Sequence, residues 1–206
     1  MKKIVVIGAG GFGKEVVMLL EQINKVSLQW QILGFYDDAI KAGSIINGYA
    51  VLGNLDDLNL IDEQVSVAIA VGDSATRAKI FNKITNTHIS YPVLVHPSVL
   101  IGDYVIIGEG TIITANNILT VNINVGKFVV LNLACTVGHD AILEDFTSFM
   151  PSVNISGGVK VRKGVYVGTG AQILNHIEIG AWTKVGAGAV VKESLPAHCT
   201  AVGVPA

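Results

Sequence analysis

A histidine followed directly by an aspartate, His139 and Asp140 in the segment TVGHDAILEDF, is the side-chain pair best suited to proton transfer in this chain. An imidazole changes charge near neutral pH, so one ring nitrogen can take a substrate proton while an acceptor holds the other. The pair therefore predicts a general base. Adjacent residues on a strand face opposite ways, so the spacing alone leaves open whether Asp140 orients the ring.

A glycine-rich loop near the start, GAGGFGKE at residues 8–15, resembles two kinds of phosphate-binding loop. Gly8, Gly10 and Gly13 match the dinucleotide spacing G-x-G-x-x-G, whereas the P-loop pattern fails at Glu15, where a Ser or Thr should ligate magnesium. The glycines follow an apolar run and precede a helix-like stretch at residues 14–23, whose N-terminal amides could face an anion. The loop predicts a nucleotide site and leaves the nucleotide open.

The composition predicts a soluble globular protein of the cytoplasm. Half of the 206 residues are apolar, 15% are charged and the net charge is −2, so nothing indicates a nucleic-acid partner or an anionic membrane surface. The sequence shows neither a signal peptide nor an apolar stretch of about 18 residues that could span a membrane. Its two cysteines, Cys135 and Cys199, lie in no C-x-x-C pair and are interpreted as free thiols.

Two differently patterned halves must position these residues. From residue 1 to about residue 90, apolar runs such as KIVVIG, QILGFYDD and VSVAIAVGD alternate with helical patterns, the last over residues 74–85. This alternation predicts a parallel sheet with crossover helices. Ninety residues are half of a full doubly wound domain, so a nicotinamide dinucleotide would lack its second half-site.

The second half, residues 91–206, has a strict period of six. Every sixth residue from Ile101 to Val191 is apolar, and the residues two places earlier are mostly small or β-branched. This period predicts a triangular solenoid with three short strands and about 18 residues per turn, in about five turns over residues 97–191. Glycine often follows the repeat position, where we expect a tight corner with unusual backbone angles. These glycines stand at positions 102, 108, 126, 138, 168, 180 and 186.

The pattern [LIV]-G-x-x-x-x resembles the hexapeptide repeat of the left-handed parallel β-helix. The resemblance implies an acyltransferase that works as a homotrimer with active sites between subunits, although the fold also serves structural proteins and zinc carbonic anhydrases. Those carbonic anhydrases place two histidines five residues apart, and the residues five after His139 and His176 are Glu144 and Ala181. We therefore expect no metal. The other histidines, His88, His96 and His198, are interpreted as structural or surface residues.

The whole chain resembles the family of sialic acid O-acetyltransferases and nucleotide-sugar N-acetyltransferases. The resemblance rests on IGAGGFGKEV, GFYDD and AIAVGD in the first half and on VGHDAILEDF and AVGVPA in the second. It implies a small Rossmann-like domain that binds the nucleotide of the sugar substrate. The implied contacts are Gly10, Gly11, Phe12, Asp37, Asp38, Gly72 and Asp73. Gly10 and Phe12 depart from the Ser and His that several N-acetyltransferases have there.

The resemblance also implies the chemistry. His139 would be the catalytic base with Asp140 as its acidic partner, and Asn132 would contact the sugar. Acetyl-CoA, the co-substrate, would lie near Gly157, Thr169 and Ala187. The implied reaction is direct acetyl transfer to the 4-amino group of a UDP-linked 4-amino-4,6-dideoxy sugar for surface glycan synthesis. Cys135, predicted inside the coil, is badly placed to carry the acetyl group.

Three alternatives stay open at this point. One is O-acetylation of sialic acid or another sugar hydroxyl, because a histidine base serves an amine and a hydroxyl alike. Another is a nucleotide-binding scaffold with a solenoid that catalyses nothing. The third is an NAD-binding module in residues 1–90.

Overall fold

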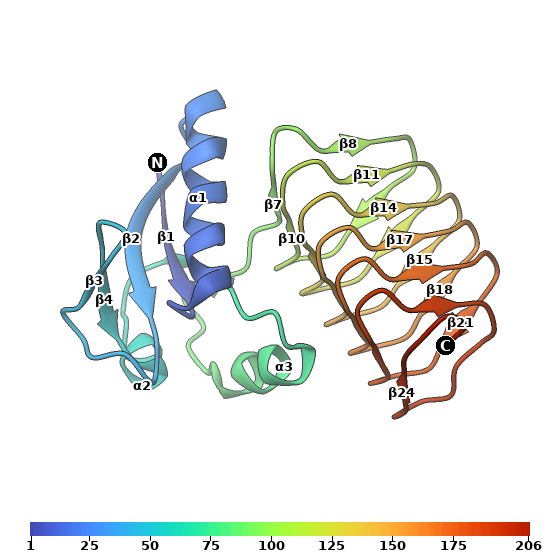
Figure 1. The fold of residues 1–206 in the computed structure, drawn as a ribbon. Coiled ribbons are helices and arrows are strands. Elements are labelled where there is room, and N and C mark those ends of the chain that lie inside the picture. Colours follow the sequence, from blue (N-terminus) through green and yellow to red (C-terminus); the bar gives the residue numbers. More distant parts are fainter.

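The N-terminal half is an α/β unit built on one six-stranded sheet. The computed structural model describes all residues, 1–206, and Figure 1 shows this unit in blue to green beside the solenoid. Its elements in chain order are β1 (Lys2–Ile7), α1 (Gly11–Val26), β2 (Trp30–Tyr36), β3 (Ile45–Ile46), β4 (Tyr49–Gly53), α2 (Leu55–Asn59), β5 (Val65–Ile69), α3 (Ser74–Lys83) and β6 (Ile89–Ser90).

The predicted parallel sheet with crossover helices is confirmed. The strand order is β3-β4-β2-β1-β5-β6, and every pair is parallel except the hairpin of β3 and β4. β5 is buried throughout, as expected of a strand covered on both faces. Helix α1 begins three residues before the predicted start. Its N-cap residue, Gly10, has no side chain, so the sequence carries no capping signal there.

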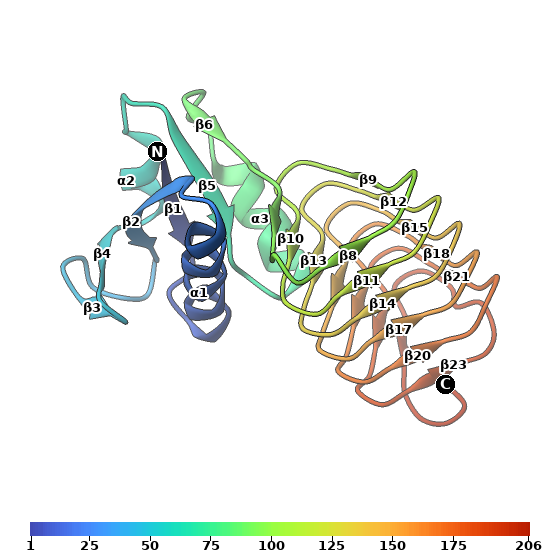
Figure 2. The same ribbon diagram turned by 90° about the horizontal axis from the view of Figure 1, so that it is seen from above.

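The second half is a solenoid of short parallel strands, which Figures 1 and 2 show stacked from green to red. Its strands form three sheets, which we call faces I, II and III. Face I comprises β7 (Leu94–Val95), β10 (Ile112–Ile113), β13 (Val130–Leu131), β16 (Ser148–Phe149), β19 (Tyr166–Val167), β22 (Lys184–Val185) and β24 (Thr200–Ala201). Face II comprises β8 (Leu100–Ile101), β11 (Ile118–Leu119), β14 (Thr136–Val137), β17 (Asn154–Ile155), β20 (Gln172–Ile173) and β23 (Val190–Val191). Face III comprises β9 (Ile106–Ile107), β12 (Asn124–Val125), β15 (Ile142–Leu143), β18 (Lys160–Val161) and β21 (Glu178–Ile179).

The hexad positions form the core that the sequence predicts. From Ile113 onward every one of them is buried, and so are the smaller residues two places earlier, Cys135 among them. At the first turn Ile101 is 43% exposed, because no preceding turn covers it. The strands run from Leu94 to Ala201, so the solenoid extends past the predicted 97–191 at both ends. Its left-handed sense stays a prediction.

The expected reason for the corner glycines is wrong. The glycines that follow the repeat position have no positive φ, and the left-handed conformation occurs two residues later, as at Asp140 with a φ of 61°. What requires glycine is crowding between turns. A Cβ on Gly138 would come within 2.6 Å of the backbone nitrogen of Gly157 in the next turn. Small side chains at these positions let the turns stack at normal strand spacing.

The two halves meet where α3 packs on the solenoid, and the predicted boundary at residue 90 falls between β6 and β7. Phe81 of α3 packs on Phe128 and Phe146, with ring centroids 4.5 and 5.7 Å away. Beside them Arg77 is only 1% exposed and donates hydrogen bonds to both halves. Its acceptors are the carbonyls of Val71, Gly72, Phe128, Phe146 and Thr147 and the hydroxyl of Ser148.

Candidate functional site

His139 and Asp140 form a hydrogen-bonded pair at the corner between faces II and III. The distance from His139 Nδ1 to Asp140 Oδ2 is 2.7 Å, and both side chains are about 60% exposed, at 61% and 59%. The residues lie in a turn, where the left-handed backbone of Asp140 brings the two side chains together despite their adjacency. The hydrogen bond from His139 and a second one from Asn122 hold the pKa of Asp140 below its ordinary value.

The ionised Asp140 carboxylate can only accept, so Nδ1 of His139 donates and Nε2 is free to take a proton. Gly157, one turn further along, borders this nitrogen, and a Cβ on Gly157 would collide with the His139 ring. No protein group accepts the backbone N–H of Gly157. The corner thus combines a proton acceptor with an amide donor that nothing else uses, the two groups that acyl transfer requires.

Three other predicted site residues lie at a different corner, between faces I and II. Thr169 and Ala187 are exposed there, whereas Asn132 is 7% exposed and accepts the N–H of Leu133. A ligand that contacts both corners must cross face II or lie between two copies of the chain. This separation follows from the six-residue period, because residues 18 positions apart share a corner, as Thr169 and Ala187 do, whereas His139 and Thr169 are 30 positions apart.

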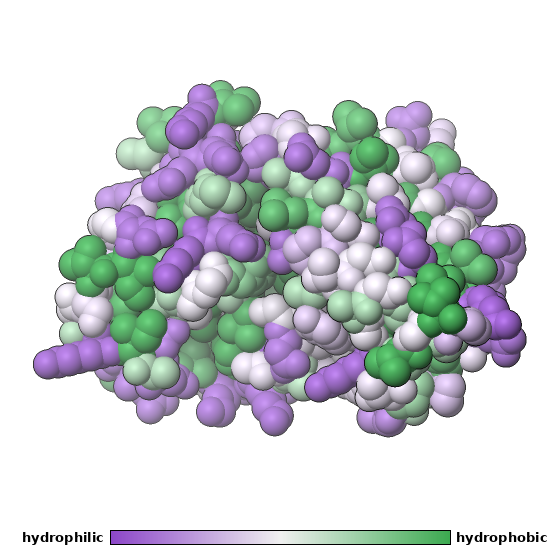
Figure 3. Space-filling view, viewed as in Figure 1, coloured by the Kyte–Doolittle hydropathy of each residue, from purple (hydrophilic) through white to green (hydrophobic).

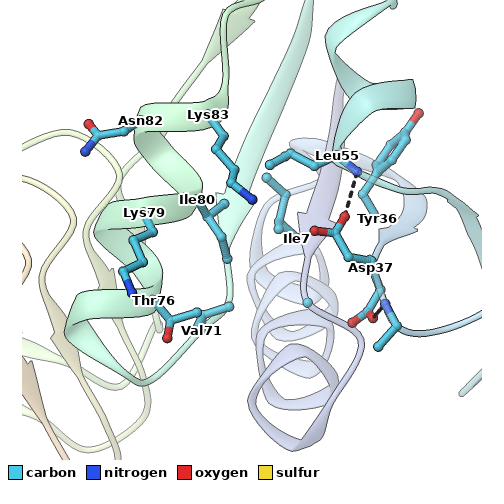
Figure 4. Close-up of a pocket in the computed structure, with 13 residues that line it drawn as sticks. Ile7, Tyr36, Asp37, Leu55, Val71, Thr76, Lys79, Ile80, Asn82 and Lys83 are labelled. Atoms are coloured by element: carbon cyan, nitrogen blue, oxygen red, sulfur yellow. Dashed lines mark hydrogen bonds between the residues drawn. The ribbon is translucent and has the colours of Figure 1, made fainter.

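A cavity of about 520 Å³ in the N-terminal half opens at the carboxyl ends of the strands, where ligands of open α/β sheets bind. Figure 4 shows it between β1 and β2 on one side and α3 on the other. Ile7, Tyr36, Leu55, Val71 and Ile80 give it an apolar base. Its size is that of a small-molecule site.

Asp37 and Asp38 of GFYDD line this cavity, and both carboxylates also hold the loops around it. Asp37 accepts backbone N–H groups of Ala9 and Ala39, at 2.8 and 2.9 Å. Asp38 accepts the N–H of Leu55 at 3.0 Å, the bond drawn in Figure 4. Asp37 and Asp38 therefore shape the rim of the cavity.

The opposite wall contributes residues that sequence reasoning missed. Thr76, Lys79 and Lys83 of α3 line the cavity, and in Figure 4 the amine of Lys83 extends across it toward Ile7 and Leu55. On the helix these lysines stand four residues apart and so share one face. This spacing was a usable signal, but lysines on a short helix are usually solvated. Only the packing of α3 distinguishes them.

The glycine loop lies next to the cavity, with Gly8 in its lining. A Cβ on Gly13 would collide with the carbonyl of Gly8, so glycine there lets α1 start close against β1. Gly10 and Gly11 face open space at the start of α1, where free backbone N–H groups favour an anion. Phe12 instead packs against the hydrophobic core of this half.

Gly72 and Asp73 lie outside this cavity, at the junction of the two halves. The Gly72 carbonyl accepts from Arg77 and Ser148, and Asp73 caps α3 by accepting from Thr76. Both residues line a smaller cavity of about 270 Å³ with residues of the solenoid. Figure 3 shows the two halves as one continuous surface, with hydrophobic side chains set in a hollow left of centre.

The remaining predicted features have simple positions. His96 accepts the N–H of Ser98 and closes a turn, as a structural histidine would. Cys135 is fully buried, and burial raises the pKa of its thiol to about 11. No cluster of three or more metal-ligating side chains is present. None of the helices is both long enough and apolar enough to cross a membrane.

Comparisons with known proteins match both halves. The family model "PglD N-terminal domain" matches residues 3–84. GDP-perosamine N-acetyltransferase of Escherichia coli O157:H7 is 30% identical over 207 residues, covering 98% of this chain and 93% of that protein. The chain also matches serine acetyltransferases, of which it spans about a third of the length, 34% in that of Salmonella typhimurium.

Two solved structures resemble the complete fold. A variant of perosamine N-acetyltransferase from Caulobacter crescentus, in complex with CoA and GDP-perosamine, has a TM-score of 0.90 at 29% identity, covering 100% of this chain and 95% of that one. WeeI from Acinetobacter baumannii AYE also has a TM-score of 0.90, at 35% identity, covering 100% and 98%.

Proposed function

Because the chain belongs to the hexapeptide-repeat sugar N-acetyltransferases, we propose that it transfers acetyl from acetyl-CoA to the amino group of a nucleotide-linked amino sugar. The observation that carries the proposal is the hydrogen-bonded His139 and Asp140 pair beside the unused N–H of Gly157. It stands on a chain that aligns from end to end with a sugar N-acetyltransferase.

In the proposed mechanism His139 is the general base. Its Nε2 takes a proton from the amine as the amine attacks the thioester carbonyl, while Asp140 keeps the ring oriented and stabilises the imidazolium that forms. The N–H of Gly157 donates to the oxyanion of the tetrahedral intermediate. As the intermediate collapses, the C–S bond breaks and the His139 imidazolium gives its proton to the sulfur, so that CoA leaves as the thiol and the amide remains. Buried Cys135 takes no part.

The nucleotide occupies the 520 Å³ cavity in this proposal. The apolar base accommodates the nucleobase and ribose, Lys79 and Lys83 supply positive charge, and the amide groups at Gly10 and Gly11 face the diphosphate. We propose a UDP-linked 4-amino-4,6-dideoxy sugar as substrate. The GDP-perosamine complex of the Caulobacter relative favours a GDP-linked amino sugar as the second candidate.

We propose that the protein acts as a homotrimer whose copies meet at face II. Exposed apolar side chains gather on this face and its two corners: Leu100, Ile118, Leu133 and Leu174 are 36–65% exposed. The corner of His139 and the corner of Thr169 and Ala187 both border this face. With face II turned to a neighbour, His139 of one copy lies beside Thr169 and Ala187 of the next, which gives acetyl-CoA contacts at both corners.

The test follows CoA thiol release with acetyl-CoA and four acceptors: a UDP-linked and a GDP-linked 4-amino-4,6-dideoxy sugar, free sialic acid and CMP-sialic acid. A rate with one of the amino sugars at least about tenfold above the sialic acids supports N-acetylation. The reverse order identifies an O-acetyltransferase. Full activity in His139→Ala would contradict the role of His139 as the base. If the wild type turns over none of the acceptors, the alternative of a nucleotide-binding scaffold is favoured.

A further inference from the structure

The 270 Å³ cavity at the junction of the two halves, here called the junction cavity, is built from both of them. Gly72 and Asp73 come from the loop after β5, and Met150, Tyr166 and Lys184 come from the solenoid. Tyr166 and Lys184 are neighbours on face I, because β19 pairs with β22 in that register. Each points outward, opposite the core residue that follows it.

Rigid contacts fix the walls of the junction cavity. Ser148, which pairs with Tyr166 on face I, donates to the Gly72 carbonyl at 2.7 Å and accepts from Ser74 at 3.0 Å. Buried Arg77 donates to the same carbonyl and to the Ser148 hydroxyl. The loop therefore cannot shift relative to face I without breaking buried hydrogen bonds, and the cavity keeps its shape.

The junction cavity lies across a single loop from the 520 Å³ cavity, here called the nucleotide cavity. Val71 and Thr76 line the nucleotide cavity, whereas Gly72 and Asp73, which lie between them in the chain, line the junction cavity. A ligand that occupies both cavities must pass this loop. The loop also leads into the N-terminus of α3, which the Asp73 side chain caps by accepting the N–H of Thr76.

The lining of the junction cavity suits a sugar ring. Burial alone would raise the pKa of Asp73, but hydrogen bonds from Thr76 and the charge of Lys184 bring that pKa below its ordinary value, so a carboxylate faces the cavity. Lys184 and the Tyr166 hydroxyl add donors, and Met150 with the tyrosine ring adds apolar surface. In small-molecule sites, a few polar groups set in a largely apolar wall fix the orientation of the ligand.

We propose that the junction cavity binds the sugar part of the nucleotide sugar, with Tyr166 and Lys184 as specificity-determining residues. This inference rests on the proposed function and deepens it. Under this proposal Gly72 and Asp73 contact the sugar, whereas the family resemblance implied that they contact the nucleotide. Because the cavity lies on face I near the corner of Thr169, the bound amine faces the His139 of a second copy rather than that of its own chain.

The experiment measures binding by calorimetry, without turnover, to the nucleoside diphosphate, the matching nucleotide amino sugar and CoA. The variants are Lys184→Met and Tyr166→Phe. The control is Lys160→Met, an exposed lysine of face III outside every cavity described. We expect Lys184→Met to weaken nucleotide-sugar binding about tenfold and Tyr166→Phe about fivefold, from the usual strength of charged and neutral hydrogen bonds. Binding of the nucleoside diphosphate and of CoA should stay within about twofold.

Other outcomes overturn the assignment. If the variants weaken binding of the nucleoside diphosphate equally, the cavity binds phosphates rather than the sugar. If they weaken binding of CoA, the cavity belongs to the co-substrate site. If they weaken no binding, the cavity is only a feature of the packing. A wild-type protein that binds the nucleotide sugar no more tightly than its nucleoside diphosphate overturns it as well. Tight sugar-dependent binding without acetyl transfer would contradict the proposed function and leave the sugar subsite standing.

Discussion

At the scale of single residues, the candidate site depends on one side-chain pair. Its residue types can be read from the sequence, but the contact between them cannot. The segment TVGHDAILEDF predicts His139 as a candidate base and Asp140 as its acidic partner. Strand alternation argues against their contact, but alternation fails in a turn, and the left-handed φ of Asp140 allows the 2.7 Å hydrogen bond. Lys79 and Lys83 stayed hidden because nothing local distinguishes a cavity lysine from a solvated one.

The first residue-scale prediction concerns Asp140→Asn. Asparagine tolerates the left-handed backbone, so the turn should survive while the charge is lost. Since the pKa of Asp140 lies below its ordinary value, the carboxylate stays charged throughout the neutral range, and its contribution is lost only as the pH falls through that lowered pKa. We expect kcat to fall by about tenfold or more, part of what general-base catalysis supplies.

The loss of kcat in Asp140→Asn should be the same throughout the neutral range, because the Asp140 carboxylate of the wild type stays charged there. A pH–rate series with wild type and Asp140→Asn measures the loss at each pH. Glu193→Gln, an exposed acid at the far end of the solenoid, is the control and should not lower kcat. An unchanged kcat in Asp140→Asn would remove Asp140 from the mechanism.

The second residue-scale prediction is Gly157→Ala. The backbone of Gly157 has no positive φ, so alanine fits the turn, but its Cβ collides with the His139 ring. Moving a catalytic group by about 1 Å costs about 100-fold in rate, and we expect a loss of kcat of that order. Thermal unfolding should stay close to that of the wild type. Full activity would show that the position of the His139 ring does not matter.

At the scale of elements, the repeat made the solenoid predictable, whereas the contact of α3 with face I was not. An apolar residue every sixth position identifies coil, faces and core, because each turn repeats the same environment. Arg77 shows the limit. In the sequence it is one charged residue on a short helix, yet its guanidinium is buried against carbonyls from both halves. No local pattern announces such a long-range contact.

We predict that Arg77→Met destabilises the fold by about 3 kcal/mol or more, since it leaves several buried carbonyls without a donor. Urea unfolding measures the change, and limited proteolysis shows whether the halves separate. Arg162→Met is the control, because Arg162 bonds Glu144 and Glu178 in exposed ion pairs and its loss should be much smaller. Equal losses in the two variants would contradict the clamping role of Arg77.

At the scale of the whole molecule, the nucleotide cavity and His139 belong to different sides of the solenoid. The cavity lies beside α3, which packs at face I, while His139 lies between faces II and III. The six-residue period assigns His139 to its corner, but no local pattern places the N-terminal half against face I, so the sequence alone could not reveal this arrangement. Under the proposed trimer, each complete site takes the nucleotide from one chain and the base from another.

Mixed oligomers test this arrangement. His139→Ala lacks the base, and Lys83→Glu places a negative charge in the nucleotide cavity, so each variant alone should be inactive. When the two are co-expressed, about a quarter of the sites in randomly assembled cyclic trimers combine an intact cavity with an intact base. We expect about that fraction of wild-type activity. A mixture no more active than its separate variants would place both parts of the site in one chain.

The stacking of identical turns makes the solenoid a ruler with fixed divisions. Paired residues stand 18 positions apart, as Asn122 and Asp140 do, and each turn adds one strand spacing of about 4.8 Å. Inserting 18 residues would add one complete turn and leave every later strand on the same face. Inserting six would turn all later corners by a third of a revolution. The reach between the turns of His139 and Ala187 can therefore change only in whole steps, which constrains how such a chain can be retuned to a longer or shorter acyl carrier.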